Sequence, residues 1–487
     1  MANAGRNGQE RRRADDEPED NPPWWAVGLG VAAGVAAVAG GIYMLSQTEQ
    51  AQREVAERES EQSEVASDPR GAGGMENIND AVSRLAITSS PSVTNLNSLL
   101  NDIHVRYVAI KREVFEHHYN VFMKVFYPLH ENMKSVDAYY ERYSSRVQFA
   151  GSHFDRLRIK KPDEFDMDIV IGLPVNMRVD PLEPAESDVV IEPKHPGFVQ
   201  LRAGRQYLKI LERDNYDINK QAFLWLDEKK YILRSKFISW FRSVVDRALN
   251  KFQKYNGYPS VRIDGEVYTV SVSSSGPAYT LRISAPGFRL DVDLVPALRF
   301  PEERWLGSSK TYRDIPPRCH ADYWLVVPKP NKFGANSFDE NRSWRVAMHD
   351  QEKKFIHNSY HLRQANRLLK KLRDAQQMDY IVSYHIKTLF LWKISELNDA
   401  SFWQRDVATI FKVMLREFYD ALVAKKISYF WNRRNNMIEK VPEHILIGYA
   451  NKLATLVTKL EDDRNYMWAA KYLLTGSEYA EYERILN

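Results

Sequence analysis

The sequence of 487 residues contains a single cysteine, Cys319. One thiol excludes a disulfide framework, an iron–sulfur centre and a cysteine-rich zinc site, and it is typical of a domain that works in the reducing cytosol. The first 75 residues also lack lysine: seven arginines stand against 13 aspartates and glutamates, although the whole chain has a net charge of +4. A moderately basic body therefore follows an acidic leader, which is compatible with nucleotide or nucleic-acid partners.

Composition and hydrophobic content exclude a mostly disordered chain, because 44% of the residues are hydrophobic and 12% are aromatic. The exception is the N-terminal part. We expect an acidic disordered leader at 1–23 and a flexible linker at 46–90, which is rich in Gln, Glu, Ser and Arg and almost free of large apolar residues.

Between these two segments, residues 24–45 form an uncharged apolar run of 22 residues. As a helix this run spans roughly 33 Å, enough to cross the hydrocarbon core of a bilayer. Aromatic residues stand near both ends, Trp24 and Trp25 at one and Tyr43 at the other, as at membrane interfaces. The acidic leader is unlike the short basic region of a signal peptide. The run therefore predicts a transmembrane helix, and Gly30 and Gly34 in a GxxxG spacing offer a weak signal for self-association.

The remaining chain predicts an α+β fold with two lobes. Apolar residues at spacings of three and four predict a long helix from Asn95 to about Ser144, which Pro128 bends or breaks. Period-two patterns then predict strands, and the last part of the chain is helical. The predicted strands are 165–171, 266–272, 279–284 and 288–295, the last three forming an antiparallel meander, and the predicted helices are 349–374, 379–396, 402–425 and 442–472. We place a core lobe with a mixed sheet and a long spine helix at 91–345, a helical lobe at 346–475 and a C-terminal tail at 476–487.

Alternating carboxylates mark two of the predicted strands. Glu164, Asp166 and Asp168 share one face of the first strand because residues two apart point the same way, and Asp291 and Asp293 repeat the pattern on another. Carboxylates gathered in this way suit Mg²⁺ or Mn²⁺, which bind a triphosphate and activate a hydroxyl for attack. Strand geometry alone leaves open whether Glu164 and Asp166, or Asp166 and Asp168, form the metal pair.

Motifs along the chain resemble the Mab-type nucleotidyltransferases, the family of cyclic GMP-AMP synthase and the cyclic GMP-AMP synthase-like receptors. The resemblance covers about 95–475. Its motifs are Gly151-Ser152 followed by Glu164-Phe165-Asp166, the strand Val292–Leu298, the segment Tyr323–Lys329 with Ser343–Val346, and the helical segments Asn366–Lys371 and Val382–Thr388. The family pattern implies that Glu164 and Asp166 are the metal pair with Asp293 as third ligand, and that Asp168 and Asp291 lie further out or face solvent.

The same resemblance implies nucleotide-binding roles. Gly151 and Ser152 would hold the triphosphate, and Arg345 would contact a base. Lys370 and Ser383 would contact phosphates, and Tyr384 would stack on a base. The implied fold is a bilobal nucleotidyltransferase, and the implied activity is synthesis of a cyclic dinucleotide from ATP and GTP with Mg²⁺ or Mn²⁺, in innate immune signalling. A cysteine-rich zinc insertion of the kind found in cyclic GMP-AMP synthase is absent from the sequence between Tyr360 and Tyr380, so double-stranded RNA and double-stranded DNA both remain candidate activators.

The N-terminal segment supports a second hypothesis, a catalytically silent, membrane-anchored adaptor like the mitochondrial dynamics proteins of the same fold, although their metal-binding residues are degraded. Arg6, Arg11, Arg12 and Arg13 before the apolar run, against Arg53 and Arg58 after it, favour a cytosolic N-terminus. Nucleotide-dependent chemistry favours a cytosolic large domain instead, and we expect that orientation, in the mitochondrial outer membrane or the endoplasmic reticulum.

Overall fold

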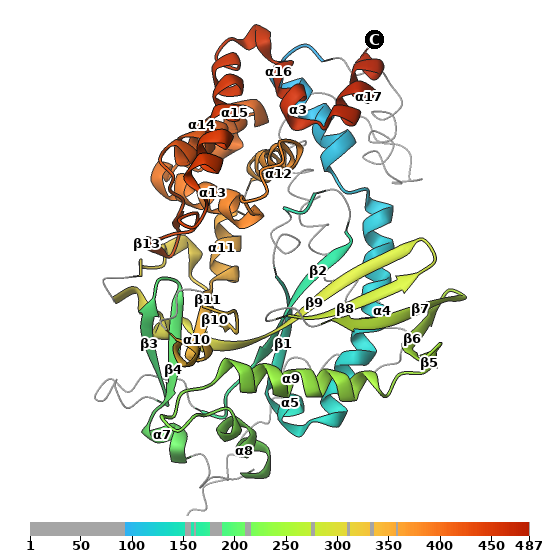
Figure 1. Cartoon of the computed structure of the whole chain (residues 1–487), viewed down its shortest axis with the longest axis vertical. Helices are drawn as coiled ribbons and strands as arrows, with labels where there is room; N and C mark the ends of the chain where they lie inside the picture. Colours follow the sequence, from blue (N-terminus) through green and yellow to red (C-terminus); the bar gives the residue numbers. More distant parts are fainter. Residues whose placement is uncertain are drawn as a thin grey trace, which may run out of the picture. The chain divides into compact units, whose positions relative to one another are not determined.

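The computed structural model describes residues 93–150, 157–159, 162–175, 188–209, 216–273, 278–308, 312–331, 336–356 and 359–486 (Figure 1). These residues belong to one compact unit, Asn79–Asn487. The predicted leader, the apolar run 24–45, the linker, and Gly151 with Ser152 lie outside the described residues. Within the described part, no helix has both the length and the apolar character needed to cross a bilayer, so the anchor at 24–45 stays a prediction.

The N-terminal helical stretch is divided into several helices rather than one. They are α3 (Leu96–Ile103), a π-helical turn (His104–Val108), α4 (Arg112–Val136) and α5 (Ala138–Tyr143). The sequence predicted that Pro128 bends or breaks the helix. The break does not occur, since α4 continues through Pro128 and buries Val125 and Leu129 on either side of it. The chain leaves the helical conformation at Ala109, which is extended, and at Asp137, whose side chain caps α5 by accepting a hydrogen bond from the Tyr140 amide.

A single large sheet follows, with the order β3-β4-β11-β10-β9-β8-β7-β6-β5, and β2 pairs with both β9 and β1 off this path. The predicted meander is confirmed, because β7, β8 and β9 pair antiparallel in sequence. The strands are β1 (Ser144–Ala150), β2 (Glu164–Ile171), β3 (Val189–His195), β4 (Phe198–Ala203), β5 (Lys254–Tyr255), β6 (Tyr258–Ile263), β7 (Glu266–Ser273), β8 (Tyr279–Ala285), β9 (Phe288–Pro301), β10 (Tyr323–Val327) and β11 (Ser343–Ala347). The accompanying helices are α7 (Arg205–Leu208), α8 (Tyr216–Leu224), α9 (Arg234–Leu249) and α10 (Ser337–Arg342).

The C-terminal part is helical, as predicted, with one small hairpin of β12 (Ser428–Tyr429) and β13 (Asn432–Asn436). Its helices are α11 (His349–Ile356), α12 (Tyr360–Ala375), α13 (Ser383–Leu397), α14 (Val407–Val423), α15 (Glu443–Lys459), α16 (Trp468–Leu473) and α17 (Gly476–Leu486). The segment 476–487, expected as a tail, is instead mostly the helix α17. It joins the fold through fully buried Tyr482 and through Glu478, which pairs with Lys371 of α12.

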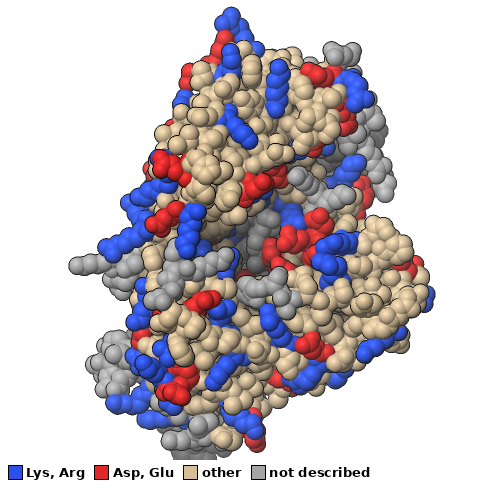
Figure 2. All heavy atoms as spheres, in the orientation of Figure 1, with Lys and Arg blue, Asp and Glu red and all other residues tan. Residues whose placement is uncertain are grey.

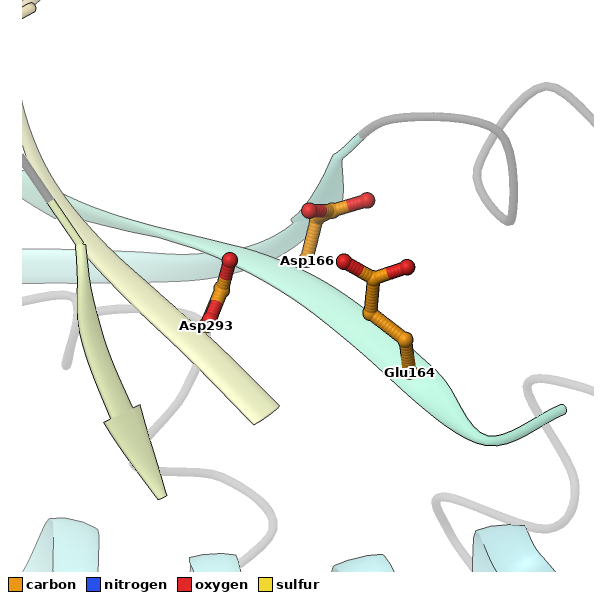
Figure 3. A group of neighbouring side chains, drawn as sticks. All are labelled: Glu164, Asp166 and Asp293. Carbon is orange, nitrogen blue, oxygen red and sulfur yellow. The ribbon is translucent and has the colours of Figure 1, made fainter. Parts of the chain in front are cut away.

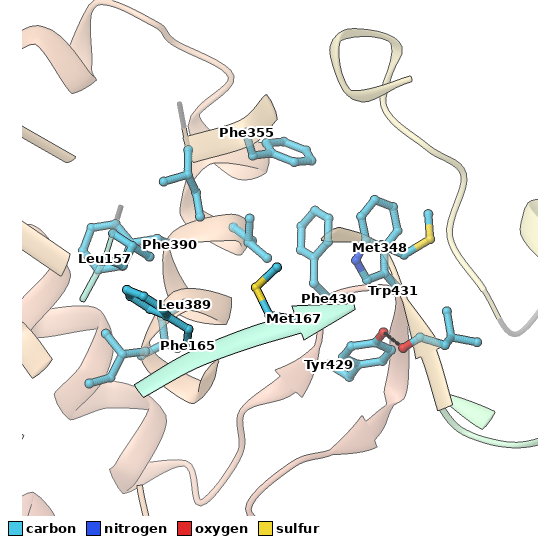
Figure 4. Packing of buried hydrophobic residues seen from close by; sticks show 14 of the residues in the cluster. Leu157, Phe165, Met167, Met348, Phe355, Leu389, Phe390, Tyr429, Phe430 and Trp431 are labelled. Carbon is cyan, nitrogen blue, oxygen red and sulfur yellow. Dashed lines mark hydrogen bonds between the residues drawn. The ribbon is translucent and has the colours of Figure 1, made fainter. Parts of the chain in front are cut away.

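The α+β class is confirmed, and two packing relations position the site. The apolar face of β2 rests on the spine helix, where the Phe165 ring meets the Phe122 ring of α4 edge to face with centroids 5.2 Å apart. The same core continues into the helical region: Phe165 and Met167 of β2 belong to one cluster of buried residues with Leu389 and Phe390 of α13, part of which Figure 4 shows. In addition, α3 packs against α14 and α16, so the first helix of the described chain belongs with the last ones.

Candidate active site

Three carboxylates meet where β2 and β9 run side by side. The two strands pair in parallel, with Glu164 opposite Asp291 and Asp166 opposite Asp293. Glu164, Asp166 and Asp293 each present an oxygen within 4.8 Å of the others (Figure 3). Of the two pairs that strand geometry had left open, the structure therefore gathers Glu164 with Asp166, and the register adds Asp293.

The electrostatics of this acidic triad, Glu164, Asp166 and Asp293, favour a bound cation. Burial and the neighbouring charges of Glu164 and Asp293 raise the pKa of Asp166 from 3.8 to about 6. Burial also raises the pKa of Asp293, although the Thr280 hydroxyl donates a hydrogen bond of 2.6 Å to this carboxylate. Three carboxylate oxygens this close repel one another, and hard oxygen ligands of this kind are what Mg²⁺ and Mn²⁺ require. The donor set therefore fits a divalent cation.

Asp168 and Asp291 lie outside the triad, as the resemblance implied, but neither faces solvent freely. Asp168 is buried, and its Oδ2 lies 3.1 Å from Nε2 of His349. Burial alone would lower the pKa of His349, but the Asp168 carboxylate outweighs it and raises the pKa to about 9. Asp291 is held by Arg282 and Arg289, at 3.1 Å and 2.8 Å.

Two members of the triad, Glu164 and Asp166, line a cleft of about 460 Å³ between the sheet and helices α11, α12 and α13. Figure 2 shows a hollow near the centre of the view, with acidic side chains gathered along one side. The lining residues come from both halves of the chain: Leu157, Arg158, Ile159, Asp163, Glu164, Asp166, His349, Glu352, Lys370, Arg373, Asp374, Ser383, Tyr384 and Lys387.

Three of the predicted nucleotide contacts line this cleft, and each has a protein partner. The buried Lys370 ammonium donates a hydrogen bond of 2.6 Å to the Leu157 carbonyl. The Ser383 hydroxyl accepts a hydrogen bond of 3.1 Å from Arg373, and the Tyr384 hydroxyl donates one of 2.6 Å to Glu352. The structure thus brings Lys370, Ser383 and Tyr384 to the same cleft as Glu164 and Asp166.

Arg345 is placed differently. Among the described residues, it is not part of the cleft lining. Its guanidinium lies over two rings, 5.3 Å from the centroid of Tyr429 and 5.7 Å from that of Phe198. The Tyr429 ring in turn lies 6.3 Å from the ring of Tyr384, so Arg345 reaches the cleft through an aromatic neighbour.

A buried ion pair in the lining of the cleft is not indicated by any pattern in the sequence. Glu352 of α11 is 2% exposed and forms an ion pair of 2.9 Å with Lys387 of α13. The same carboxylate accepts hydrogen bonds from Tyr384 and from the Trp431 indole, at 2.6 Å and 2.9 Å. In the sequence Glu352 stands in a charged helical stretch, and nothing there indicates a partner 35 positions later.

The comparisons with known proteins agree with this geometry. The chain matches the Mab-21 protein nucleotidyltransferase domain over residues 153–358 and the Mab-21 protein HhH/H2TH-like domain over residues 361–455. It is 30% identical over 393 residues to a cyclic GMP-AMP synthase-like receptor of Tribolium castaneum, an alignment that covers 80% of this chain and 94% of that receptor. Receptors with the same description are 29% identical in Ctenocephalides felis, over 80% of this chain and 90% of the relative, and 27% identical in Aethina tumida, over 80% and 94%. The chain therefore belongs to the cyclic GMP-AMP synthase-like receptor family and carries a nucleotidyltransferase domain of the Mab-21 type.

Proposed function

We propose that this protein is a metal-dependent nucleotidyltransferase that makes a cyclic dinucleotide from ATP and GTP in innate immune signalling. The observation that carries the proposal is the convergence of Glu164, Asp166 and Asp293, two of which, Glu164 and Asp166, line the same cleft as Lys370 and Tyr384. The relatives are named after synthesis of cyclic GMP-AMP, which supports a related product here. A nucleic acid, double-stranded RNA or DNA, is the activator we propose, because the body of the chain is basic and the family name is that of a receptor.

Each joining step would form a phosphodiester between a ribose hydroxyl of one nucleotide and the α-phosphate of the other, with pyrophosphate as leaving group. Divalent cations held by the triad would neutralise the triphosphate and lower the pKa of the attacking hydroxyl. Asp166 must be ionised to act as a ligand, and its pKa of about 6 leaves it ionised at neutral pH. Catalysis by the protein itself would consist of positioning and charge neutralisation.

The helical wall would supply the remaining contacts by exchanging partners. A phosphate oxygen would replace the Leu157 carbonyl as the acceptor of the Lys370 ammonium, which lies 2.6 Å from that carbonyl. Ser383 would contact a phosphate in the same way. Tyr384 would stack on a base, supported from behind by Tyr429 and Arg345. Gly151 and Ser152, which the structure does not describe, remain the proposed contacts to the terminal phosphates.

The test uses the full-length chain in mild detergent, incubated with ATP, GTP and Mg²⁺ or Mn²⁺, with and without duplex RNA or DNA, and mass spectrometry of the products. We expect a cyclic dinucleotide that the double variant Glu164→Ala/Asp166→Ala does not make. Asp291→Asn is the matched control, because it changes a carboxylate of the neighbouring strand outside the triad and should keep synthesis. Undiminished synthesis by the double variant would reject the assignment of the site.

A second candidate function is a catalytically silent adaptor anchored in a membrane. Two observations favour it: the uncharged apolar run at 24–45, and the protein partners that already occupy Lys370, Ser383 and Tyr384. A folded protein that binds nucleotide without Mg²⁺ and yields no product under any of the conditions above would favour the adaptor.

In either case, we propose a single-pass protein with its large domain in the cytosol, in the mitochondrial outer membrane or the endoplasmic reticulum. Epitope tags at both ends, probed by antibody after selective permeabilisation of the plasma membrane, test the orientation. A C-terminal tag that antibody reaches only after the organelle membrane is also permeabilised would contradict the proposed orientation.

A further inference from the structure

The guanidinium of Arg158 is in direct contact with the acidic triad. Its Nη1 lies 2.9 Å from Oε2 of Glu164, and its Nη2 lies 2.8 Å from Oδ1 of Asp163. The guanidinium thus bridges two adjacent carboxylates at the start of β2, one of which belongs to the triad. Its charge also reaches Asp166, whose pKa would lie higher without it.

The arginine is held more firmly than the carboxylates it contacts. Its side chain is 16% exposed, against 48% for Glu164 and 57% for Asp163. The preceding residue, Leu157, is buried in the core, and its carbonyl accepts the hydrogen bond from buried Lys370 of α12. The backbone that carries Arg158 is therefore tied to the helical wall of the cleft, and the guanidinium is presented to Glu164 from a supported position.

In this position, the guanidinium of Arg158 would compete with a divalent cation for the Glu164 carboxylate. One of the two carboxylate oxygens of Glu164, Oε2, is held by Nη1 of Arg158 in this structure. An arginine does not lose its charge at any pH that a folded protein meets, so it can yield the oxygen only by moving away. Pairs with carboxylates as exposed as Glu164 add little net stability, and a divalent ion bound by three carboxylates attracts them more strongly than a single positive charge does. Asp163 offers Arg158 a partner to keep when it leaves Glu164.

We propose that Arg158 is the resident counter-cation of the metal site, which neutralises Glu164 while the site is empty and yields that carboxylate when a divalent ion binds. This inference rests on the proposed function, because it takes Glu164 to be a metal ligand. Arg158 is then a positioning residue: it holds the Glu164 carboxylate and sets the affinity with which the ion binds. Its guanidinium remains at the edge of the cleft, where it can turn to the triphosphate.

The test measures Mn²⁺ binding to the full-length chain in mild detergent, by electron paramagnetic resonance of free Mn²⁺, without nucleotide. We expect Arg158→Gln to bind Mn²⁺ about threefold to tenfold more tightly than the wild type, since the competing charge is gone, and Arg158→Lys to bind with an affinity near that of the wild type. Arg282→Gln is the matched control. It removes an arginine whose partner, Asp291, lies beside Glu164 on the neighbouring strand, without touching the triad, and we expect a change of less than about twofold.

The possible outcomes separate the two proposals. Equal or weaker Mn²⁺ binding by Arg158→Gln, in a protein whose wild type does bind Mn²⁺, overturns the role of Arg158 and leaves the proposed metal site standing. An equal rise for Arg158→Gln and Arg282→Gln also overturns it, because the effect is then one of overall charge. If neither the wild type nor Arg158→Gln binds more Mn²⁺ than Glu164→Ala/Asp166→Ala does, the metal site and the inference fail together. A merely structural role for Arg158 would lower the melting temperature without tightening metal binding.

Discussion

Asp166 carries a charge that destabilises the protein in the absence of a divalent ion, and replacing it with asparagine should reveal the cost. Its pKa is raised from 3.8 to about 6 in the folded protein, by burial and by the charges of Glu164 and Asp293. The folded state therefore binds this proton more tightly than the unfolded state does. Stability from this group is fully present below pH 3.8 and is lost as the pH rises through about 6.

The size of the effect follows from the shift. A difference of about two pKa units corresponds to about 3 kcal/mol at 1.36 kcal/mol per unit. We expect Asp166→Asn to raise the free energy of unfolding by up to about 3 kcal/mol at pH 7.5, and by about half as much at pH 5, where part of the wild-type population is protonated. Asp166→Asn has no charge to desolvate at this position, so its free energy of unfolding should change less between pH 5 and pH 7.5 than that of the wild type.

Urea unfolding followed by tryptophan fluorescence, in EDTA, measures the difference at the two pH values. Asp291→Asn removes the same charge on the neighbouring strand and serves as the control. Burial raises the pKa of Asp291, but hydrogen bonds from Arg289 and Arg282 outweigh it and bring the pKa below its usual range, so this variant should gain nothing. Added Mn²⁺ should stabilise the wild type and leave Asp166→Asn unchanged. A gain in Asp166→Asn that is absent at pH 7.5, or equal at pH 5 and pH 7.5, would refute the reasoning.

Three further predictions concern buried groups outside the triad. Lys387→Met leaves the Glu352 carboxylate buried without its 2.9 Å ion pair and should lower the free energy of unfolding by about 3 kcal/mol or more. The double variant Glu352→Gln/Lys387→Met should lose less than the sum of the two single changes. Additive losses in a double-mutant cycle measured by urea unfolding would contradict the pairing. Lys371→Met removes the partner of Glu478, in a pair whose lysine side chain is 1% exposed, and should weaken the attachment of α17. Limited proteolysis should then cut the chain near residue 475 at least about threefold faster. An unchanged cutting rate would show that α17 is held by other contacts. Burial raises the pKa of the Cys319 thiol to about 12, so iodoacetamide at pH 8 should alkylate the folded protein more than about tenfold more slowly than the urea-unfolded chain, and comparable rates would mean that this residue is not enclosed.

Local sequence patterns predicted the type of secondary structure around the site but not where each helix begins and ends. The alternation in Glu164-Phe165-Asp166-Met167 predicted a strand with an acidic and an apolar face, and β2 has both. The apolar periodicity at 95–144 predicted helix but could not locate its interruptions, because these depend on the cap at Asp137 and on the extended Ala109. Pro128 could not be judged from sequence either, since the packing of Val125 and Leu129 on both sides keeps α4 continuous across it.

The membership of the site depended on contacts that no local pattern contains. The parallel register that sets Asp166 opposite Asp293 joins residues 127 positions apart, and it is the register, not the alternation, that makes these two carboxylates neighbours. Asp168 looks equivalent to Asp166 in the strand pattern, yet it pairs with His349, the first residue of α11.

By itself, the sequence determined the chemistry that is available: which positions carry carboxylates, that Glu164 and Asp166 share a strand face, and that Lys370, Ser383 and Tyr384 stand on helices. These follow from the backbone periods of strands and helices, which act over a few residues. The tertiary structure alone decided which of these groups meet, that Glu352 and Lys387 form a buried pair in the lining of the cleft, and that Arg158 contacts Glu164. The physical reason is that hydrogen bonds and ion pairs act over a few ångströms in space, and only the packing of β2, β9 and α11–α13 brings distant parts of the chain within that range.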